Sequence, residues 1–468
     1  MRMMKCGVGA GALLAAVVAM TGCGNNLFTN GGSTITSAAT TVTQTMITDA
    51  PSDQVLALSL TVDSVVLTDS AGNSISVLSK PVTIEASHLN AIKEPFLPPI
   101  KLPQDTYVSA TITVANPVVV YVDPTTGKAV KATAVLSSPS TTVTFTTPIV
   151  VGAQAAPICF DLLVGPSVAI SGTTVTVTPT FNVFQVPLAA NPTNGSNGRV
   201  DQIFGQVVSV SGTTLTITLP NGQTLAIATD TNTKLQDIKA LTDLTAGELV
   251  DVDAVQQSTG GVLALRIHLI PAHANSLFVG PVTAVTGSPA TSFTQLVRQP
   301  LGPSAPVSAT ATTQTVAVTP ATTFQLAPTV GTLPTLPFVP TFSAATLFAG
   351  ENVVVAADAV ASATSTVTAS SVTLAPQTLE GAVTAINVTG GLTVYTITLP
   401  SGSALASLTG QTTAVVYTNT MTQAIMSATP GPGSSVRFVG LLFSDKGALR
   451  MMAVAACDPP GAAPVQHH

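Results

Sequence analysis

Charged side chains are scarce in this sequence of 468 residues. Asp, Glu, Lys and Arg together make up 8% of it, against about 25% in ordinary soluble domains. The 21 acidic residues outnumber the 15 basic ones, and no cluster of Lys and Arg is present to neutralise phosphates, so we expect no nucleic-acid partner. Tryptophan is absent and aromatic residues amount to 4%, which disfavours a stacking platform for bases or sugars.

Recognisable catalytic and metal-binding motifs are also missing. The sequence contains neither a Gly-x-Ser-x-Gly elbow nor a His-Glu-x-x-His pair. Pro271 separates His268 from His273 and prevents a helical metal pair there. We therefore expect a protein that is not an enzyme, with no catalytic residue, no cofactor and no functional metal. The five histidines are His88, His268, His273, His467 and His468.

Two groups of carboxylates are candidate sites. Asp49, Asp53 and Asp63 could offer oxygen ligands to Ca²⁺, but their spacing matches no EF-hand loop, and Asp49 fits an Asx-turn ahead of the following proline. Asp251 and Asp253 point to one face of a single predicted strand. A pair of carboxylates is the minimum for glycoside hydrolysis, yet in a strand of this composition we interpret the pair as part of a solvated face.

The first 23 residues have the pattern of a bacterial export signal. Arg2 and Lys5 give a positive start, and the apolar run at 8–20 is too short to span a bilayer. The run ends in Met-Thr-Gly-Cys, which resembles the lipobox of bacterial lipoproteins, with Met20 in place of the usual Leu. The resemblance implies that Cys23 is diacylated and anchors the mature chain to a membrane. An ordinary secretory signal with an incidental Cys23 is the alternative.

The residues after Cys23 predict the location of the anchored protein. Gly24 and Asn25 follow it with no Asp, which favours the outer membrane if enterobacterial sorting rules apply. Residues 24–45 are rich in Gly, Ser and Thr and are predicted to be a flexible tether.

Two cysteines remain for the folded chain, since Cys6 leaves with the signal. In an oxidising compartment Cys159 and Cys457 could form a disulfide between the first and last domains. Two separate buried thiols are the alternative, as is a C-terminal thiol that pairs elsewhere.

Threonine replaces charge on the polar side of the predicted strands. Thr alternates with aliphatic residues at period two, as in residues 213–219, which is typical of a half-buried strand. Many short strands between Gly, Pro and Asp clusters predict an all-β chain that begins with a β-sandwich. One short helix is expected near residues 86–93. The strands expected in the sandwich are residues 55–62, 64–67, 108–114, 118–122 and 143–151.

The region 46–188 resembles the exported-protein family known as domain of unknown function 4382. The likeness rests on Thr-Asp-Ala-Pro-Ser-Asp at 48–53 and on Leu-Pro-Gln-Asp-Thr-Tyr at 102–107. The family usually has Gly before that Tyr, where this chain has Asp105. The resemblance implies a transthyretin-like or immunoglobulin-like sandwich and implies no reaction.

The chain beyond residue 199 repeats itself three times. "Gly, any, Val, any, small, aliphatic" occurs at 205–210, 280–285 and 381–386, and such repetition indicates one structural unit used three times. Two copies share Leu-x-Ala-Gly-Glu and two share Ile-Thr-Leu-Pro-x-Gly. The pattern resembles domain of unknown function 5666, which implies small OB-like β-barrels. The second copy carries a Pro-rich insertion that is expected to be extended rather than stranded.

Together these features predict a non-enzymatic lipoprotein of the cell envelope, an interaction or structural module with an envelope protein or glycan as its partner. A carbohydrate or small-ligand binding protein is the first alternative, and an envelope hydrolase with an unrecognised site is the second. The predicted domains are a signal peptide (1–23), tether (24–45), sandwich (46–188), linker (189–199), three barrels (200–273, 274–376 and 377–458) and a tail (459–468).

Overall fold

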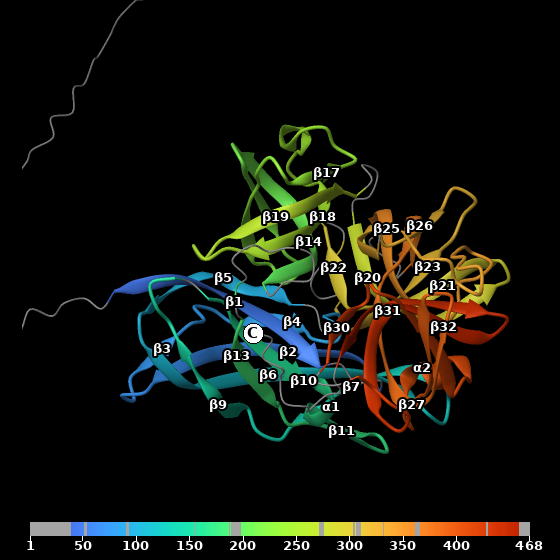
Figure 1. Ribbon diagram of the computed structural model, residues 1–468, viewed down its shortest axis with the longest axis horizontal. Coiled ribbons are helices and arrows are strands. Elements are labelled where there is room, and N and C mark those ends of the chain that lie inside the picture. The colour runs from blue at the N-terminus through green and yellow to red at the C-terminus, as the bar shows by residue number, and fades with distance from the viewer. Residues whose placement is uncertain are drawn as a thin grey trace, which may run out of the picture. The chain divides into compact units, whose positions relative to one another are not determined.

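A computed structural model describes residues 39–457 apart from 51–53, 90–92, 155, 187, 189–197, 271–275, 303–304, 306–309, 331, 361–365 and 427–428. The predicted signal peptide, Cys23, most of the tether, the core of the linker and the tail lie outside the described residues. The described residues from 39 to 457 belong to one compact unit, and strands make up most of it (Figure 1). The all-β prediction is confirmed. In the described part of the chain, none of the helices has the length and apolar character needed to cross a membrane.

The N-terminal region is a sandwich of two larger sheets around one core, and it also contains a three-stranded sheet of order β11-β12-β8. The first sheet has the order β13-β10-β1-β5, and the second has β3-β2-β6-β7 with β4 beside β2 and β9 beside β6. Leu58 and Ile112 of the second sheet and Phe96 and Phe160 of the first share this core. The elements are β1 (Thr40–Ala50), β2 (Val55–Asp69), β3 (Ser74–Ser76), β4 (Val82–Glu85), β5 (Glu94–Pro103), β6 (Thr106–Asp123), β7 (Lys128–Thr133), β8 (Val135–Leu136), β9 (Ser140–Val150), β10 (Ile158–Leu163), α1 (Val164–Ser167), β11 (Val168–Ser171), β12 (Thr174–Val177) and β13 (Phe181–Gln185).

Two sequence predictions need correction in the sandwich. The four strands expected at 55–67 and 108–122 are only two long strands, β2 and β6, whose ladder contains register shifts. Asn116 has φ of 52° just before Pro117, so the chain bends there without leaving the sheet, as at a bulge. The short helix expected at 86–93 is also wrong where it can be judged, because Ser87 and His88 form a turn and residues 90–92 lie outside the described chain.

The C-terminal region contains three closed five-stranded barrels. The first closes through β16 and β19, the second through β20 and β21, and the third through β29 and β32. In each barrel the first strand pairs with the second and the fourth, and the third runs parallel to the fifth. Closure pairs the two edges of each five-stranded sheet with each other, in a chain with few charges to discourage edge pairing.

The elements of each barrel follow in chain order. The first has β14 (Arg199–Ser211), β15 (Thr214–Thr218), β16 (Thr224–Ala228), β17 (Lys234–Gln236), η1 (Leu241–Asp243), β18 (Leu249–Gln256) and β19 (Val262–Leu269). The second has β20 (Ser276–Gly287), β21 (Ala290–Val297), β22 (Gln299–Leu301), β23 (Thr312–Ala317), β24 (Thr323–Leu326), η3 (Pro328–Val330), β25 (Asn352–Val360) and β26 (Thr366–Leu374). The third has β27 (Gln377–Thr389), β28 (Leu392–Thr398), α2 (Ala404–Thr409), β29 (Thr413–Thr418), β30 (Gln423–Ile425), β31 (Ser435–Asp445) and β32 (Ala448–Cys457).

One glycine turn recurs in all three barrels. Gly247, Gly350 and Gly433 have φ of 97°, 106° and 87°, a conformation that disfavours any side chain. Each donates its backbone N–H to the carbonyl of a valine on the first strand of its barrel, at 2.7–2.8 Å. The third copy therefore keeps the turn although its sequence lacks Ala-Gly-Glu.

The helix α2 was not expected from the sequence. Ser403 caps it by accepting a hydrogen bond from the N–H of Ala406, and Gly410 ends it with φ of 71°. A serine before the first turn and a glycine after the last are ordinary helix boundary signals. The helix has six residues, too few to show an apolar period, which is why the sequence pattern did not reveal it.

Candidate functional site

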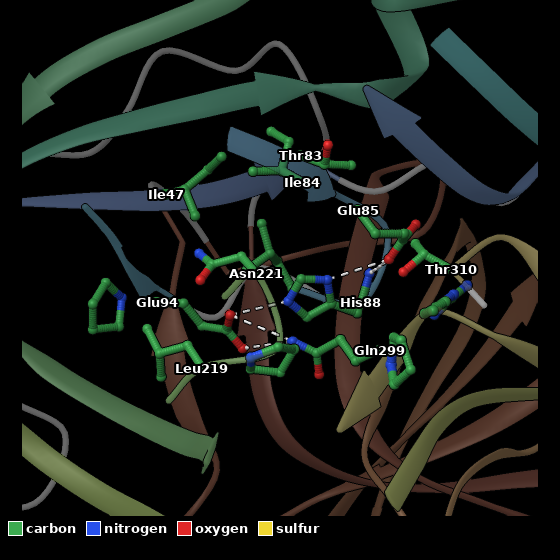
Figure 2. A pocket seen from close by; sticks show the side chains of 15 residues that line it. Ile47, Thr83, Ile84, Glu85, His88, Glu94, Leu219, Asn221, Gln299 and Thr310 are labelled. Carbon is green, nitrogen blue, oxygen red and sulfur yellow. Dashed lines mark hydrogen bonds and ion pairs between the residues drawn. The ribbon is translucent and has the colours of Figure 1, made fainter. Parts of the chain in front are cut away.

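A cluster of ionisable side chains lines a small cavity of about 40 Å³. That volume accommodates a few water molecules. Figure 2 shows His88 between the carboxylates of Glu85 and Glu94, with the amide of Gln299 beside Glu94. The Nδ1 atom of His88 lies 3.2 Å from Glu85 Oε2, and its Nε2 atom lies 3.0 Å from Glu94 Oε2.

A local turn places His88 between its partners. Glu85 is the last residue of β4, and its carboxylate accepts hydrogen bonds from the backbone N–H groups of Ser87 at 3.0 Å and His88 at 2.9 Å. Its Oε1 atom also accepts from the N–H of Leu58 at 3.0 Å. A carboxylate that binds the N–H groups two and three residues ahead fixes a turn in the manner of a helix cap. The imidazole of His88 therefore contacts the same carboxylate, that of Glu85, that accepts the hydrogen bond of its own backbone N–H.

The two carboxylates keep His88 protonated. Burial by itself lowers the pKa of His88, but the charges and hydrogen bonds of Glu94 and Glu85 outweigh burial and raise the pKa to about 10. At neutral pH both ring nitrogens of such a histidine donate hydrogen bonds. His88 therefore has no free lone pair with which to accept a proton or bind a metal.

Residues from the second barrel complete this cluster. The amide nitrogen of Gln299, the first residue of β22, lies 3.4 Å from Glu94 Oε1. The guanidinium of the buried Arg298 donates from Nε to the backbone oxygen of Leu56 at 2.6 Å. Burial lowers the pKa of Arg298, whereas Glu85 and Asp49 raise it. The cluster thus joins strands of the sandwich to the second barrel through charge-assisted hydrogen bonds.

The other histidines and the first acidic group lie apart from this cluster. His268, on β19, lies 3.0 Å from the exposed Asp237. His273, His467, His468 and Asp53 are outside the described residues. Asp49 is buried at the end of β1, while Asp63 is exposed on β2. Among the described residues, no group of three or more His, Cys, Asp or Glu is arranged to hold a metal ion.

Asp251 and Asp253 do not form the solvated face expected from their sequence. Each is only 4% exposed, and Arg266 on the neighbouring strand bridges them. Arg266 Nη2 lies 2.8 Å from Asp251 Oδ2, and its Nε lies 2.8 Å from Asp253 Oδ2. The prediction of a solvated face was wrong. The alternation of side chains along a strand determines which face Asp251 and Asp253 share, but it does not determine whether that face is buried. A carboxylate pair that shares one arginine is poorly suited to the acid and base roles of hydrolysis.

The two cysteines are both buried. Cys159 on β10 packs in one cluster with Met46, Val186 and the core of the first barrel, and burial raises the pKa of its thiol to about 12. Cys457 is the last residue of β32 in the third barrel. The pairing of these two cysteines stays a prediction.

The glycine turn carries a buried acid in the second barrel. Glu351 follows Gly350, is 1% exposed, and accepts a hydrogen bond from the N–H of Phe348 at 3.0 Å. Burial raises the pKa of Glu351 well above its usual value, although that hydrogen bond opposes the change. Glu248 makes the matching contact in the first barrel, to the N–H of Thr245.

Replacing Glu351 by Gln is expected to stabilise the protein at neutral pH, by on the order of 1 kcal/mol. The unfolded chain ionises Glu351 above about pH 4.5, while the folded site resists the charge, so the gain should vanish below that pH. Urea unfolding at pH 4 and pH 7 measures it. Glu248→Gln, at a half-buried turn, serves as the matched control and should change little. A loss of stability for Glu351→Gln at pH 7 would contradict the argument.

One part of the chain matches a known protein family. Residues 204–268, which span most of the first barrel, match a family model described as a domain of unknown function, DUF5666. The predicted resemblance of the repeats to that family is thereby supported for the first copy. Among curated proteins, none matches this chain.

Proposed function

We propose that this protein is a lipid-anchored, non-catalytic module of the cell envelope that works by binding another envelope component. The observation that supports this most is the position of His88, whose two ring nitrogens lie against the carboxylates of Glu85 and Glu94 beside a cavity of about 40 Å³. These contacts raise the pKa of His88 to about 10. Such a histidine stabilises the folded chain but cannot act as a base. Asp251 and Asp253 are likewise held by Arg266.

The lipobox-like residues 20–23 support the anchor. Acyl chains on Cys23 would place the folded chain at a membrane surface, with the Gly-, Ser- and Thr-rich tether as spacer. A chain poor in charge and rich in hydroxyl groups on its exposed strands then meets its partner at that surface. An envelope protein or a glycan fits this chemistry, whereas nucleic acid does not.

Changing Cys23 to Ser should release the protein from the membrane fraction, because the acylated thiol is lost. Cell fractionation compares the variant with the wild type, and cross-linking in intact cells identifies the bound envelope component for both. We expect the wild type in the outer-membrane fraction with a reproducible cross-linked partner. Unchanged membrane retention of Cys23→Ser would refute the anchor. A hydrolytic activity that His88→Gln or Asp251→Asn abolishes in a folded protein would refute the non-catalytic role.

A further inference from the structure

The Pro-rich insertion of the second barrel lies against the third barrel. We call residues 332–342, which precede β25, the strap. Leu333, Leu336 and Phe338 of the strap pack on an apolar cluster of the third barrel. The Phe338 ring centroid lies 5.6 Å from that of Tyr417 and 5.8 Å from that of Phe443. These residues belong to no strand, and they cover a surface rather than projecting into solvent.

Side chains alone attach the strap. Residues 332–338 belong to no strand, and within the described part of the chain they form no backbone–backbone hydrogen bond. Pro334, Pro337 and Pro340 each fix one φ angle of the strap and have no backbone N–H to donate. Between the anchoring side chains, other strap residues face solvent, and Val339 is 78% exposed. The strap is therefore a proline-rich segment that is held through three apolar side chains, Leu333, Leu336 and Phe338.

The surface beneath the strap is a continuous row across four strands. Val394 on β28 lies opposite Tyr417 on β29, Tyr417 opposite Met452 on β32, and Met452 opposite Leu441 on β31. The neighbouring residues Val416, Met451 and Leu442 fill the barrel interior. Because successive side chains of a strand point to opposite faces, the row lies on the outside of the barrel.

Two of the four positions in this row, those of Tyr417 and Val394, are large and apolar in the third barrel only, whereas the first barrel also has large apolar residues at the other two, Leu263 and Val255. Strand pairing gives the equivalent positions in the other copies: Ala228 and Ala317 stand where the third has Tyr417. Thr214 and Ser292 likewise stand where it has Val394. The copy with Tyr417 and Val394 in this row is the one that the strap covers, so these two side chains are not required by the barrel fold.

We propose that the outer row of the third barrel is a binding groove for extended, proline-rich segments that carry leucine and phenylalanine. In the free protein the strap occupies the groove as an internal ligand, and a partner segment of the same chemistry displaces it. Proline-rich segments dock on aromatic-lined grooves because their backbone is already extended and loses little entropy. This inference rests on the proposed function, since it names the kind of partner that the module binds.

The strap competes at a high effective concentration because it is tethered beside the groove, in the millimolar range for a short flexible linker. A free peptide should therefore bind the intact protein weakly and a strap-released variant well. The test uses a fluorescent peptide with the sequence of residues 332–342 and measures its anisotropy with the full chain. Release is achieved by changing Leu333, Leu336 and Phe338 to Ser. We expect the released variant to bind the peptide at least tenfold more tightly than the wild type does.

Controls separate groove binding from general stickiness. A peptide with serine at the same three positions should not bind, and Tyr417→Ala, which installs the residue of the other two barrels, should abolish binding to the released variant. Val339→Ser changes an exposed strap residue and should leave the groove closed. If the triple variant fails to fold, Phe338→Ala is used in its place. We expect it to increase the affinity for the peptide by a smaller but still measurable factor.

The proposal is overturned if folded, strap-released protein shows no gain in peptide binding, or if Tyr417→Ala leaves the gain unchanged. Failure here would leave the proposed envelope role standing, because membrane retention and cross-linking are read independently. If membrane retention and cross-linking are lost while the peptide still binds, the proposed envelope role is refuted and the binding site on the third barrel stands.

Discussion

The His88→Gln variant is expected to lose about 3–5 kcal/mol of its free energy of unfolding at pH 6, the usual cost of removing one partner from a buried ion pair. Glutamine can keep one hydrogen bond but no charge, so the carboxylates of Glu85 and Glu94 are left facing each other beside a small cavity. Urea or thermal unfolding of the purified protein measures the loss. Unfolding of the first domains should be affected first, since the cluster joins the sandwich to the second barrel.

The effect of His88→Gln should depend on pH in a defined direction. The pKa of His88 is about 10 in the folded protein, against the ordinary histidine value of 6.5 that applies in the unfolded chain. Its stabilisation is therefore complete below about pH 6.5 and declines as the pH rises toward 10. The difference between wild type and variant should shrink accordingly, and a difference that is constant from pH 6 to pH 10 would contradict the charged state.

His268→Gln is the matched control for this experiment. Burial and Arg266 lower the pKa of His268, so the ring is neutral at pH 7, and its partner Asp237 is 64% exposed. We expect a loss below about 1 kcal/mol, because the variant gives up only a hydrogen bond to a partner in contact with water. Equal losses for the two variants would show that the ion pairs of His88 are not what stabilises the junction.

Arg266→Met should be as damaging as His88→Gln, again by about 3–5 kcal/mol. Asp251 and Asp253 are 6% and 5% exposed at their side chains, and methionine fills the space without compensating their charge. Hydrogen exchange of β18 and β19, read by mass spectrometry, should rise along with the drop in unfolding free energy.

Neutralising the two acids tests the reason for that loss. The triple variant Arg266→Met, Asp251→Asn, Asp253→Asn should recover most of the stability, because asparagine retains the hydrogen bond that Asp253 accepts from the N–H of Gln202 and adds no buried charge. A triple variant as unstable as Arg266→Met alone would show that packing of the arginine stem, and not charge, dominates.

Much of the architecture was predictable from local patterns. Strand type follows from Thr and aliphatic residues alternating at period two, and the repeat follows from three similar segments with Gly and Val at fixed spacing. The predictions failed where a strand continues past an irregularity, as at Asn116 in β6, and where an element is too short to show a period, as in α2. The boundaries of the predicted domains and the lipid on Cys23 stay predictions.

The candidate site was harder to predict because its parts are distant in the chain. Glu85, His88 and Glu94 lie within ten residues of one another. This grouping of ionisable residues was a signal in the sequence, but it matches no standard catalytic or metal-binding motif. Arg298 and Gln299, more than 200 residues later, meet them only after the second barrel has folded. The same holds for Arg266, whose role depends on strand register.

The sequence by itself determined the strand pattern, the repeat of one barrel unit and the scarcity of charge, because each is set by neighbouring residues and side-chain type. Only the tertiary structure decided which carboxylates are buried, which histidine is charged and which barrel face the strap covers. These properties depend on which residues lie opposite a side chain across strands and domains. Burial is the physical reason, because it places Asp251 and Asp253 against Arg266, His88 between two carboxylates and Tyr417 under the strap.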